Sequence, residues 1–268
     1  MRVLISGVKG QLGRSVLDSS NKSVEILGLD KNEFDLQNFE LCRKIINDFR
    51  PNWIVNTAAY TAVDKAESNR KLAFSINALG VENLAKSVTN IGGRLLHIST
   101  DFVFDGKKRK PYKTKDICNP INTYGESKLK GETLALKYPS TIVLRTSWLY
   151  SRYGRNFCIT MLKLHKRNNS INIPLKVVSD QMGSPTNCKT LAKICWKFID
   201  PKIEKKSFDK IYHWSDKGII SWYDFSKAIG TIGKKLNLIN SPAEVIPIKS
   251  TDYFTEAKRP KYSVLDCN

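Results

Sequence analysis

The sequence predicts an α/β fold: a doubly wound parallel sheet with a smaller C-terminal domain interleaved with it. Over the first 150 residues, short apolar runs alternate with amphipathic stretches, which is the order of βαβ units. After Ser147 the alternation becomes less regular, yet no repeat and no low-complexity linker divides the chain. A chain of 268 residues is long enough for a large sheet domain and a smaller companion folded against it.

The regular part is expected to form five strands joined by helices. It begins with the apolar run "RVLIS", and each later strand follows an amphipathic stretch. The expected strands are 2–6, 24–29, 53–57, 94–99 and 141–146, and the expected helices lie near 11–19, 38–49, 70–90 and 124–137. Strands connected in this way lie parallel and are joined by right-handed crossovers.

The second half contains three stretches with helical spacing and one short strand. The helical stretches are 156–167, 187–199 and 221–236, and "KIYHWS" (210–215) can return to the sheet as a further strand. We therefore expect residues 1–147, with a return over 186–216, to form the sheet domain. Residues 148–185 and 217–268 are expected to form the smaller domain.

Charge and composition limit the possible partners. The net charge is +19, but the 32 lysines are scattered and outnumber the 12 arginines, so a solvated lysine-rich surface is favoured over nucleic-acid binding. Such a surface would still attract an anionic nucleotide. No apolar run reaches the roughly 18 residues of a membrane span, and the chain opens on a strand, so no membrane or signal segment and a cytoplasmic location are expected. The six cysteines show no C-x-x-C spacing, and no metal site is expected.

Three glycines follow the first expected strand in the pattern "GVKGQLG". Gly7, Gly10 and Gly13 surround Gln11 and Leu12 at the start of the first helix. A turn of this kind lets backbone N–H groups and a helix N-terminus approach a pyrophosphate. Its place in a βαβ series predicts a Rossmann-like dinucleotide-binding domain, with the smaller domain then binding the substrate.

The second expected strand ends at an acidic residue. Asp30 lies where a carboxylate would accept the 2′-hydroxyl of an adenosine ribose, whereas Lys31 would favour a 2′-phosphate. The choice between NADH and NADPH therefore stays open. Further candidates for the adenine and ribose path are Asp35, Leu36, Ala58, Ala59 and Tyr60.

Tyr124 and Lys128 stand four residues apart, so they share one face of the expected helix. A nearby ammonium lowers the pKa of a phenol, which is what proton exchange near neutral pH requires. Thr100 or Ser99, at the end of the fourth strand, could hold the same carbonyl oxygen. A second pair, Tyr223 and Lys227, lies in an amphipathic stretch and is interpreted as structural.

Together these motifs resemble the extended short-chain dehydrogenase/reductases, and within them the dTDP-4-dehydrorhamnose reductase family. The narrower resemblance spans nearly the whole chain. It rests on "GQLG" (10–13), "NTAAYTAVDKAE" (56–67), "STDFVFDG" (99–106), "YGESKLKGE" (124–132), "RTSWLY" (145–150), "NF" (156–157), "DQMGSPT" (180–186) and "RPKYSVLD" (259–266).

The resemblance implies NADPH- or NADH-dependent reduction of the C4 ketone of a nucleotide-linked 4-keto-6-deoxy-L-sugar. By this resemblance Tyr124 donates a proton to the forming alkoxide, Lys128 orients the nicotinamide ribose, and Thr100 hydrogen-bonds the substrate oxygen. The implied substrate contacts are Thr100, Asp101, Val103, Trp148, Asn156, Gln181 and Arg259. The implied assembly is a monomer or a homodimer.

Three departures from the family pattern qualify the resemblance. Relatives that also epimerise the sugar carry a cysteine where this chain has Phe102, which favours reduction alone. Positions matching a magnesium site of some relatives are Ser15 and Lys189, which are poor ligands. The chain ends at Asn268, where relatives usually continue, and some relatives serve as non-catalytic NADP-binding regulatory subunits. That alternative is disfavoured because the Thr100, Tyr124 and Lys128 set is intact.

Overall fold

The computed structural model describes residues 1–21, 23–200 and 209–268, and its centre is a six-stranded parallel sheet. The strand order is β10-β5-β4-β3-β1-β2, so the chain reverses its direction of growth between β1 and β3. The strands are β1 (Arg2–Ser6), β2 (Glu25–Leu29), β3 (Trp53–Asn56), β4 (Arg94–Thr100), β5 (Thr141–Thr146) and β10 (Ile211–His213). The strand expected at 210–215 thus returns to the sheet, where Ile211 pairs with Val143.

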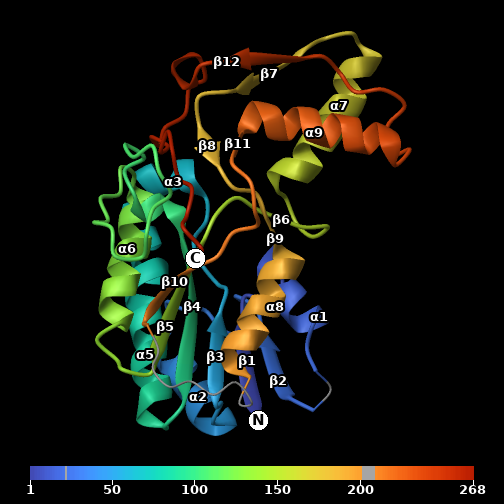
Figure 1. Ribbon diagram of the computed structural model, residues 1–268. Coiled ribbons are helices and arrows are strands. Elements are labelled where there is room, and N and C mark those ends of the chain that lie inside the picture. Colours follow the sequence, from blue (N-terminus) through green and yellow to red (C-terminus); the bar gives the residue numbers. More distant parts are fainter. Residues whose placement is uncertain (22, 201–208) are drawn as a thin grey trace.

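Helices cover both faces of this sheet (Figure 1). One layer holds α1 (Gln11–Asp18) and α8 (Cys188–Ile199), and the other holds α2 (Phe39–Phe49), α5 (Val81–Asn90) and α6 (Thr123–Ala135). Successive strand side chains alternate between the two cores: Val3 and Ile5 pack toward α1 and α8, and Leu4 packs toward α2 and α5. The predicted doubly wound Rossmann-like fold is confirmed.

The helix expected near 70–90 is longer and less uniform than the pattern suggests. It consists of α3 (Val63–Ser68), α4 (Arg70–Phe74), a π-helical segment (Ser75–Gly80) and α5. Within the π-helical segment, the Asn77 side chain binds both backbone groups of Tyr60 and donates to Ser127 Oγ at 2.9 Å. The wider turn therefore ties the loop after β3 to α6.

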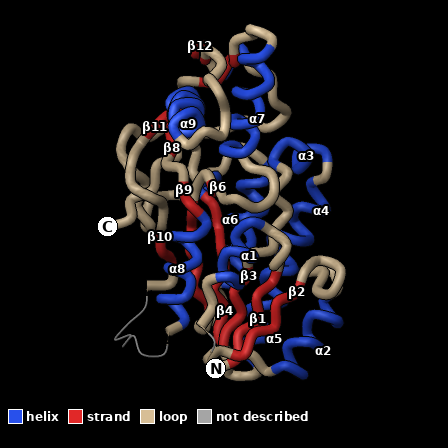
Figure 2. The backbone as a smooth tube through the Cα atoms, turned by 90° about the vertical axis from the view of Figure 1, so that its right-hand side faces the viewer, coloured by secondary structure: helices blue, strands red, loops and turns tan. Residues whose placement is uncertain are grey.

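The second part of the chain builds a separate, smaller layer above the sheet (Figure 2). It contains α7 (Phe157–Ser170) and α9 (Trp222–Lys235), with their own core around Phe225 and Ile229. The short strands here are β6 (Leu149–Tyr150), β7 (Leu175–Val178), β8 (Met182–Gly183), β9 (Thr186–Asn187), β11 (Ile220–Ser221) and β12 (Val245–Ile248). Among the described residues, Asp101–Val103 and Ser250–Asp252 form 3₁₀ turns.

The end of the chain departs from the expected division. Leu265 pairs with Tyr112 and joins the buried cluster of Val103 and Phe104, so the last residues pack on the sheet domain although 217–268 was assigned to the smaller one. The other boundaries, at 147, 186 and 216, stay a prediction. In the described ranges, no helix is both long and apolar enough to cross a membrane.

Gly131 provides a test of this packing. A Cβ there would lie 2.0 Å from the Asn77 carbonyl oxygen, because α6 presses directly on the π-helical segment. Gly131→Ala should lower the free energy of unfolding by about 1–3 kcal/mol. Urea unfolding monitored by circular dichroism measures this, with the exposed neighbour Lys130→Ala as the control. Equal midpoints for the two variants would contradict the close contact.

Candidate active site

A cleft opens at the carboxyl ends of the parallel strands, where the strand order reverses between β1 and β3. It has a volume of about 650 Å³. Of the predicted site residues, it is lined by Gly7, Gly10, Gln11, Leu12, Gly13, Asp30, Lys31, Asp35, Leu36, Ala58, Ala59, Ser99, Thr100, Asp101, Tyr124, Lys128 and Trp148. Residues far apart in the sequence therefore meet in one cavity.

The glycine turn fits a pyrophosphate. Gly7 has φ of +76°, a left-handed conformation that L side chains rarely adopt. A Cβ on Gly13 would lie 2.3 Å from the Gly7 oxygen and 2.7 Å from Thr57 Oγ1, so the turn packs too closely for any larger residue. The N-terminus of α1 follows at Gln11, which places unpaired N–H groups at the mouth of the cleft.

The adenosine end of the cleft contains an ion pair. Asp30 is 6% exposed, accepts a hydrogen bond from the Asn32 N–H at 2.8 Å and binds Lys9. Hydrogen bonding to Lys9 lowers the pKa of the Asp30 carboxyl. The sequence analysis did not single out Lys9, although its position inside the glycine turn, two residues after Gly7, could have indicated it. Neutralised by Lys9 and flanked by Lys31, Asp30 does not exclude a 2′-phosphate.

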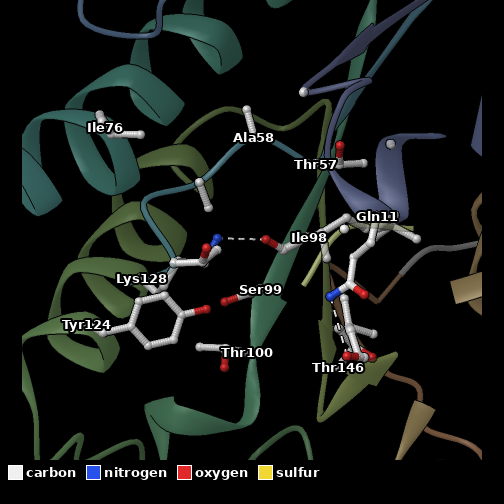
Figure 3. A pocket seen from close by; sticks show the side chains of 18 of the residues that line it. Gln11, Thr57, Ala58, Ile76, Ile98, Ser99, Thr100, Tyr124, Lys128 and Thr146 are labelled. Atoms are coloured by element: carbon white, nitrogen blue, oxygen red, sulfur yellow. Dashed lines mark hydrogen bonds between the residues drawn. The ribbon is translucent and has the colours of Figure 1, made fainter. Parts of the chain in front are cut away.

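Tyr124, Lys128, Ser99 and Thr100 lie together, as Figure 3 shows. Tyr124 and Lys128 come from the first two turns of α6, and the other two from the end of β4. Lys128 is 1% exposed, and its Nζ donates to the Ile98 oxygen at 2.7 Å. Thr100 lines the cleft beside Tyr124, and the Phe102 ring packs edge-on against the tyrosine at 5.8 Å.

The pKa of Tyr124 differs from the expected direction. Burial raises it to about 12, and the charge of Asp101 adds to the increase, while the hydrogen bond from Thr100 lowers it. Burial also lowers the pKa of Lys128 to about 8, against the attraction of Glu132. The expectation of an acidified phenol considered only the neighbouring charge; in this site desolvation of the ionised form dominates.

Asp101 is a buried carboxyl group beside the tyrosine. Its Oδ1 accepts from Thr100 Oγ1 at 3.1 Å, and its side chain is 2% exposed. Burial raises its pKa to about 7, with hydrogen bonds from Ser263 and Thr100 acting in the opposite direction.

A second cavity of about 570 Å³ adjoins the first and is lined mostly by the second part of the chain, with Asp64 and Phe102 from the first part. Phe102, Trp148 and Trp222 line both cavities, and the two tryptophan rings stack with centroids 3.4 Å apart. Gln181 and Arg259, predicted as substrate contacts, line the second cavity. Trp222 was missed because it lies in a stretch that looked like an ordinary amphipathic helix.

Three predicted site residues lie elsewhere. Val103 is fully buried in the cluster with Phe104, so its assignment to the sugar pocket is corrected: the 3₁₀ turn after β4 points it into the core. Asn156 caps α7 by accepting from the Ile159 N–H at 3.0 Å, and it lines neither cavity. Tyr60 also lines neither cavity, because Asn77 holds its backbone.

Two further side chains are committed to protein contacts. Arg259 forms a bidentate ion pair with Asp64, at 2.7 and 3.0 Å, while facing the second cavity. The pair therefore connects "RPKYSVLD" to "NTAAYTAVDKAE".

Tyr223 packs at the edge of the smaller core with Lys227 over its ring, which agrees with the structural interpretation.

The buried carboxyl of Asp101 gives a pH-dependent stability. The pKa of Asp101 is about 7 in the folded protein and about 4 in the unfolded chain. Between these pH values the folded protein binds one more proton than the unfolded chain, so the free energy of unfolding decreases as pH rises from about 4 to 7. Asp101→Asn lacks this loss. The free energy of unfolding of this variant should exceed that of the parent by on the order of 1–4 kcal/mol at pH 8 and should differ little near pH 4. Chemical unfolding at each pH measures both values. A gain independent of pH would contradict the assignment.

Comparisons with known proteins agree with this site. The profile described as "RmlD substrate binding domain" matches residues 1–268. The dTDP-4-dehydrorhamnose reductase of Aggregatibacter actinomycetemcomitans is 41% identical, covering 99% of this chain and 90% of that protein. The crystal structure of the Clostridium acetobutylicum dTDP-4-dehydrorhamnose reductase has a TM-score of 0.90 and 40% identity, covering 99% of this chain and 90% of that one. The Bacillus anthracis reductase, solved in complex with NADP, has a TM-score of 0.90 and 36% identity, and the match covers 100% of this chain and 90% of that one. The chain therefore belongs to the dTDP-4-dehydrorhamnose reductase family.

Proposed function

We propose that the protein reduces the C4 ketone of dTDP-4-dehydro-L-rhamnose to give dTDP-L-rhamnose, with NADPH or NADH as the reductant. One observation carries the proposal: Tyr124, Thr100 and Lys128 line the first cavity, and Phe102, which packs against Tyr124, also lines the second. A carbonyl group held there would lie between a cofactor cleft and a separate pocket for the rest of the substrate. The names of the full-length relatives support the same substrate.

A bound nicotinamide cofactor supplies the hydride. Tyr124 holds the proton: with a pKa of about 12 its phenol stays protonated at neutral pH, yet a sugar alkoxide is a stronger base and takes that proton. The Thr100 hydroxyl, which donates to Asp101 in the free protein, would rotate to donate to the same oxygen and position it. Lys128, bound to the Ile98 oxygen on the floor of the cleft, orients the ribose beside Tyr124. Each role depends on residues fixed by β4 and α6.

Phe102 supports reduction without epimerisation. A cysteine at this position would supply a group able to exchange a proton at a sugar carbon. The Phe102 ring has no titratable group, borders both cavities and packs against Tyr124. The sugar then faces an apolar wall of Phe102, Trp148 and Trp222, with the Asp101 carboxyl beside it and with Gln181 and Arg259 toward the nucleotide.

The alternative, a regulatory subunit that binds NADP without catalysis, has less support. A binding protein needs the glycine turn but has no use for a half-buried tyrosine beside a buried threonine and a buried lysine in the same cleft. Expectations that remain predictions are a cytoplasmic location, a monomer or homodimer, and the absence of nucleic-acid and membrane partners.

Tyr124→Phe tests the proton donor. The variant should bind the cofactor normally, because only a hydroxyl group is removed. Its turnover number should fall about 10²–10⁴-fold, because that hydroxyl is the proposed proton donor. Loss of nicotinamide absorbance with the 4-keto sugar nucleotide measures turnover. Tyr223→Phe is the matched control, since it removes the hydroxyl of the other tyrosine–lysine pair and should retain full activity. An unimpaired Tyr124→Phe enzyme would refute the role, and an inert parent protein would favour the regulatory alternative.

Lys9→Ala tests how the cleft accepts either cofactor. Without Lys9, the Asp30 carboxylate is no longer neutralised and repels a 2′-phosphate. The dissociation constant for NADPH should rise about tenfold while that for NADH changes little. Fluorescence titration measures both constants, with the exposed Lys130→Ala as control. Equal weakening for the two cofactors would show that Lys9 contacts a part common to both.

A further inference from the structure

A row of buried polar side chains crosses the sheet beneath the cleft, and the proposed mechanism does not use it. Ser6, Asn56 and His97 are direct register partners on β1, β3 and β4. All three are fully buried, and none lines the cleft. The row ends at Lys128 on α6, where His97 Nε2 lies 3.1 Å from Nζ. Burying these polar groups has a cost, so their arrangement calls for a physical reason.

The orientation of the Asn56 amide is fixed by its neighbours. Its Oδ1 lies 3.2 Å from the Ala58 backbone N–H, which can only donate, and 2.6 Å from the Ser6 hydroxyl. Oδ1 is therefore the acceptor, and Nδ2 is the atom 3.0 Å from His97 Nδ1. An amide nitrogen can only donate, so His97 Nδ1 must accept.

The tautomer of His97 follows from this contact. With Nδ1 accepting, the neutral ring carries its hydrogen on Nε2, directed at Lys128. A neutral amine at Lys128 satisfies both neighbours, because it donates to the Ile98 oxygen and accepts from Nε2–H. An ammonium has no lone pair and would meet that N–H with a hydrogen of its own. The row therefore disfavours the charged lysine.

Other charged groups near Lys128 do not reverse this effect. Glu132, one turn along α6, is neutralised by Arg145 of β5 through contacts of 2.6–3.1 Å. Tyr124, one turn earlier, keeps its proton at neutral pH. Burial lowers the pKa of Lys128 to about 8 despite Glu132, and burial together with Lys128 lowers that of His97 far enough to keep the ring neutral.

We propose that His97 is a positioning residue, whose Nε2–H, set by Asn56 and Ser6, disfavours the ammonium form of Lys128 in the free protein. The inference rests on the proposed function, in which Lys128 orients the cofactor ribose. Cofactor phosphates favour the ammonium. Near and above pH 8, where part of Lys128 in the free protein is the amine, cofactor binding therefore draws a proton from solvent. His97 thus makes cofactor binding depend on pH.

Nitrogen-15 NMR of the unmodified protein tests the tautomer directly. The chain has three histidines, so histidine-specific labelling gives three ring systems, and His97 is assigned as the one missing from His97→Gln. The expected result is a neutral ring protonated at Nε2 at neutral pH. A ring protonated at Nδ1, or a charged ring, would overturn the proposal.

The pKa of Lys128 provides the second test, by carbon-13 NMR of labelled lysine, with the resonance assigned by its absence from Lys128→Met. His97→Gln can offer an amide oxygen to Lys128, and Asn56→Asp forces the hydrogen onto Nδ1, so each should raise this pKa by about one unit or more. His165→Gln removes another fully buried histidine, which contacts Ser226, and should change nothing. An unchanged pKa in both variants would overturn the proposal.

Calorimetry in buffers of different ionisation enthalpy measures the proton uptake. At about pH 8.5, NADPH binding to the parent should take up about half a proton or more, and binding to His97→Gln about a quarter of a proton or less. This readout needs no sugar substrate. Equal uptake by the two proteins would reject the role of His97 while leaving the reductase function intact, whereas normal linkage in a protein without turnover would reject only the function.

Discussion

The position of α6 against the sheet is the constraint on which the site depends. Tyr124 can meet Thr100 only if the helix lies unusually close to β4, and two glycines permit this: a Cβ on Gly125 would lie 2.2 Å from the Phe102 oxygen, and one on Gly131 would meet the Asn77 oxygen. Two buried polar contacts then fix the helix. Lys128 binds β4, and one turn later Glu132 binds Arg145 of β5. Removing one partner of such a pair costs about 3–5 kcal/mol, so sliding of the helix is strongly opposed.

The same closeness explains why the active site lies at a boundary between two cores. The sheet domain supplies the glycine turn, the threonine and the tyrosine, whereas the smaller domain supplies the tryptophan wall. Trp148 adopts φ of +46°, which is strained for a residue with a Cβ, and Gly183 leaves room for its ring. The backbone strain is offset by the stack with Trp222, which places both rings across the junction of the cavities.

Much of this arrangement could be predicted from the sequence because it follows from local patterns. Apolar periodicity located the six strands of the sheet, and the glycine spacing, Asp30, Thr100, Tyr124 and Lys128 each carry a chemical requirement in a short motif. What was missed depends on contacts between distant segments. No local pattern reports that Trp222 stacks on Trp148 or that Val103 points into the core. That Ser6, Asn56 and His97 lie side by side also depends on how the strands pair, which the sequence of each strand does not reveal.

Burial favours the neutral form of each titratable group at this site. It raises the pKa of Tyr124 and Asp101 and lowers that of Lys128, so each group is moved toward its neutral form. The charge that orders the reaction must then come largely from the phosphates of the bound nucleotides, while the lysines at the rim, Lys9 and Lys31, attract them. A site with little net charge of its own needs only small movements of protons to respond when phosphate arrives. Because a weakly polar interior strengthens each hydrogen bond that it contains, the single hydroxyl of Tyr124, the proposed proton donor, is enough to select which oxygen receives the proton.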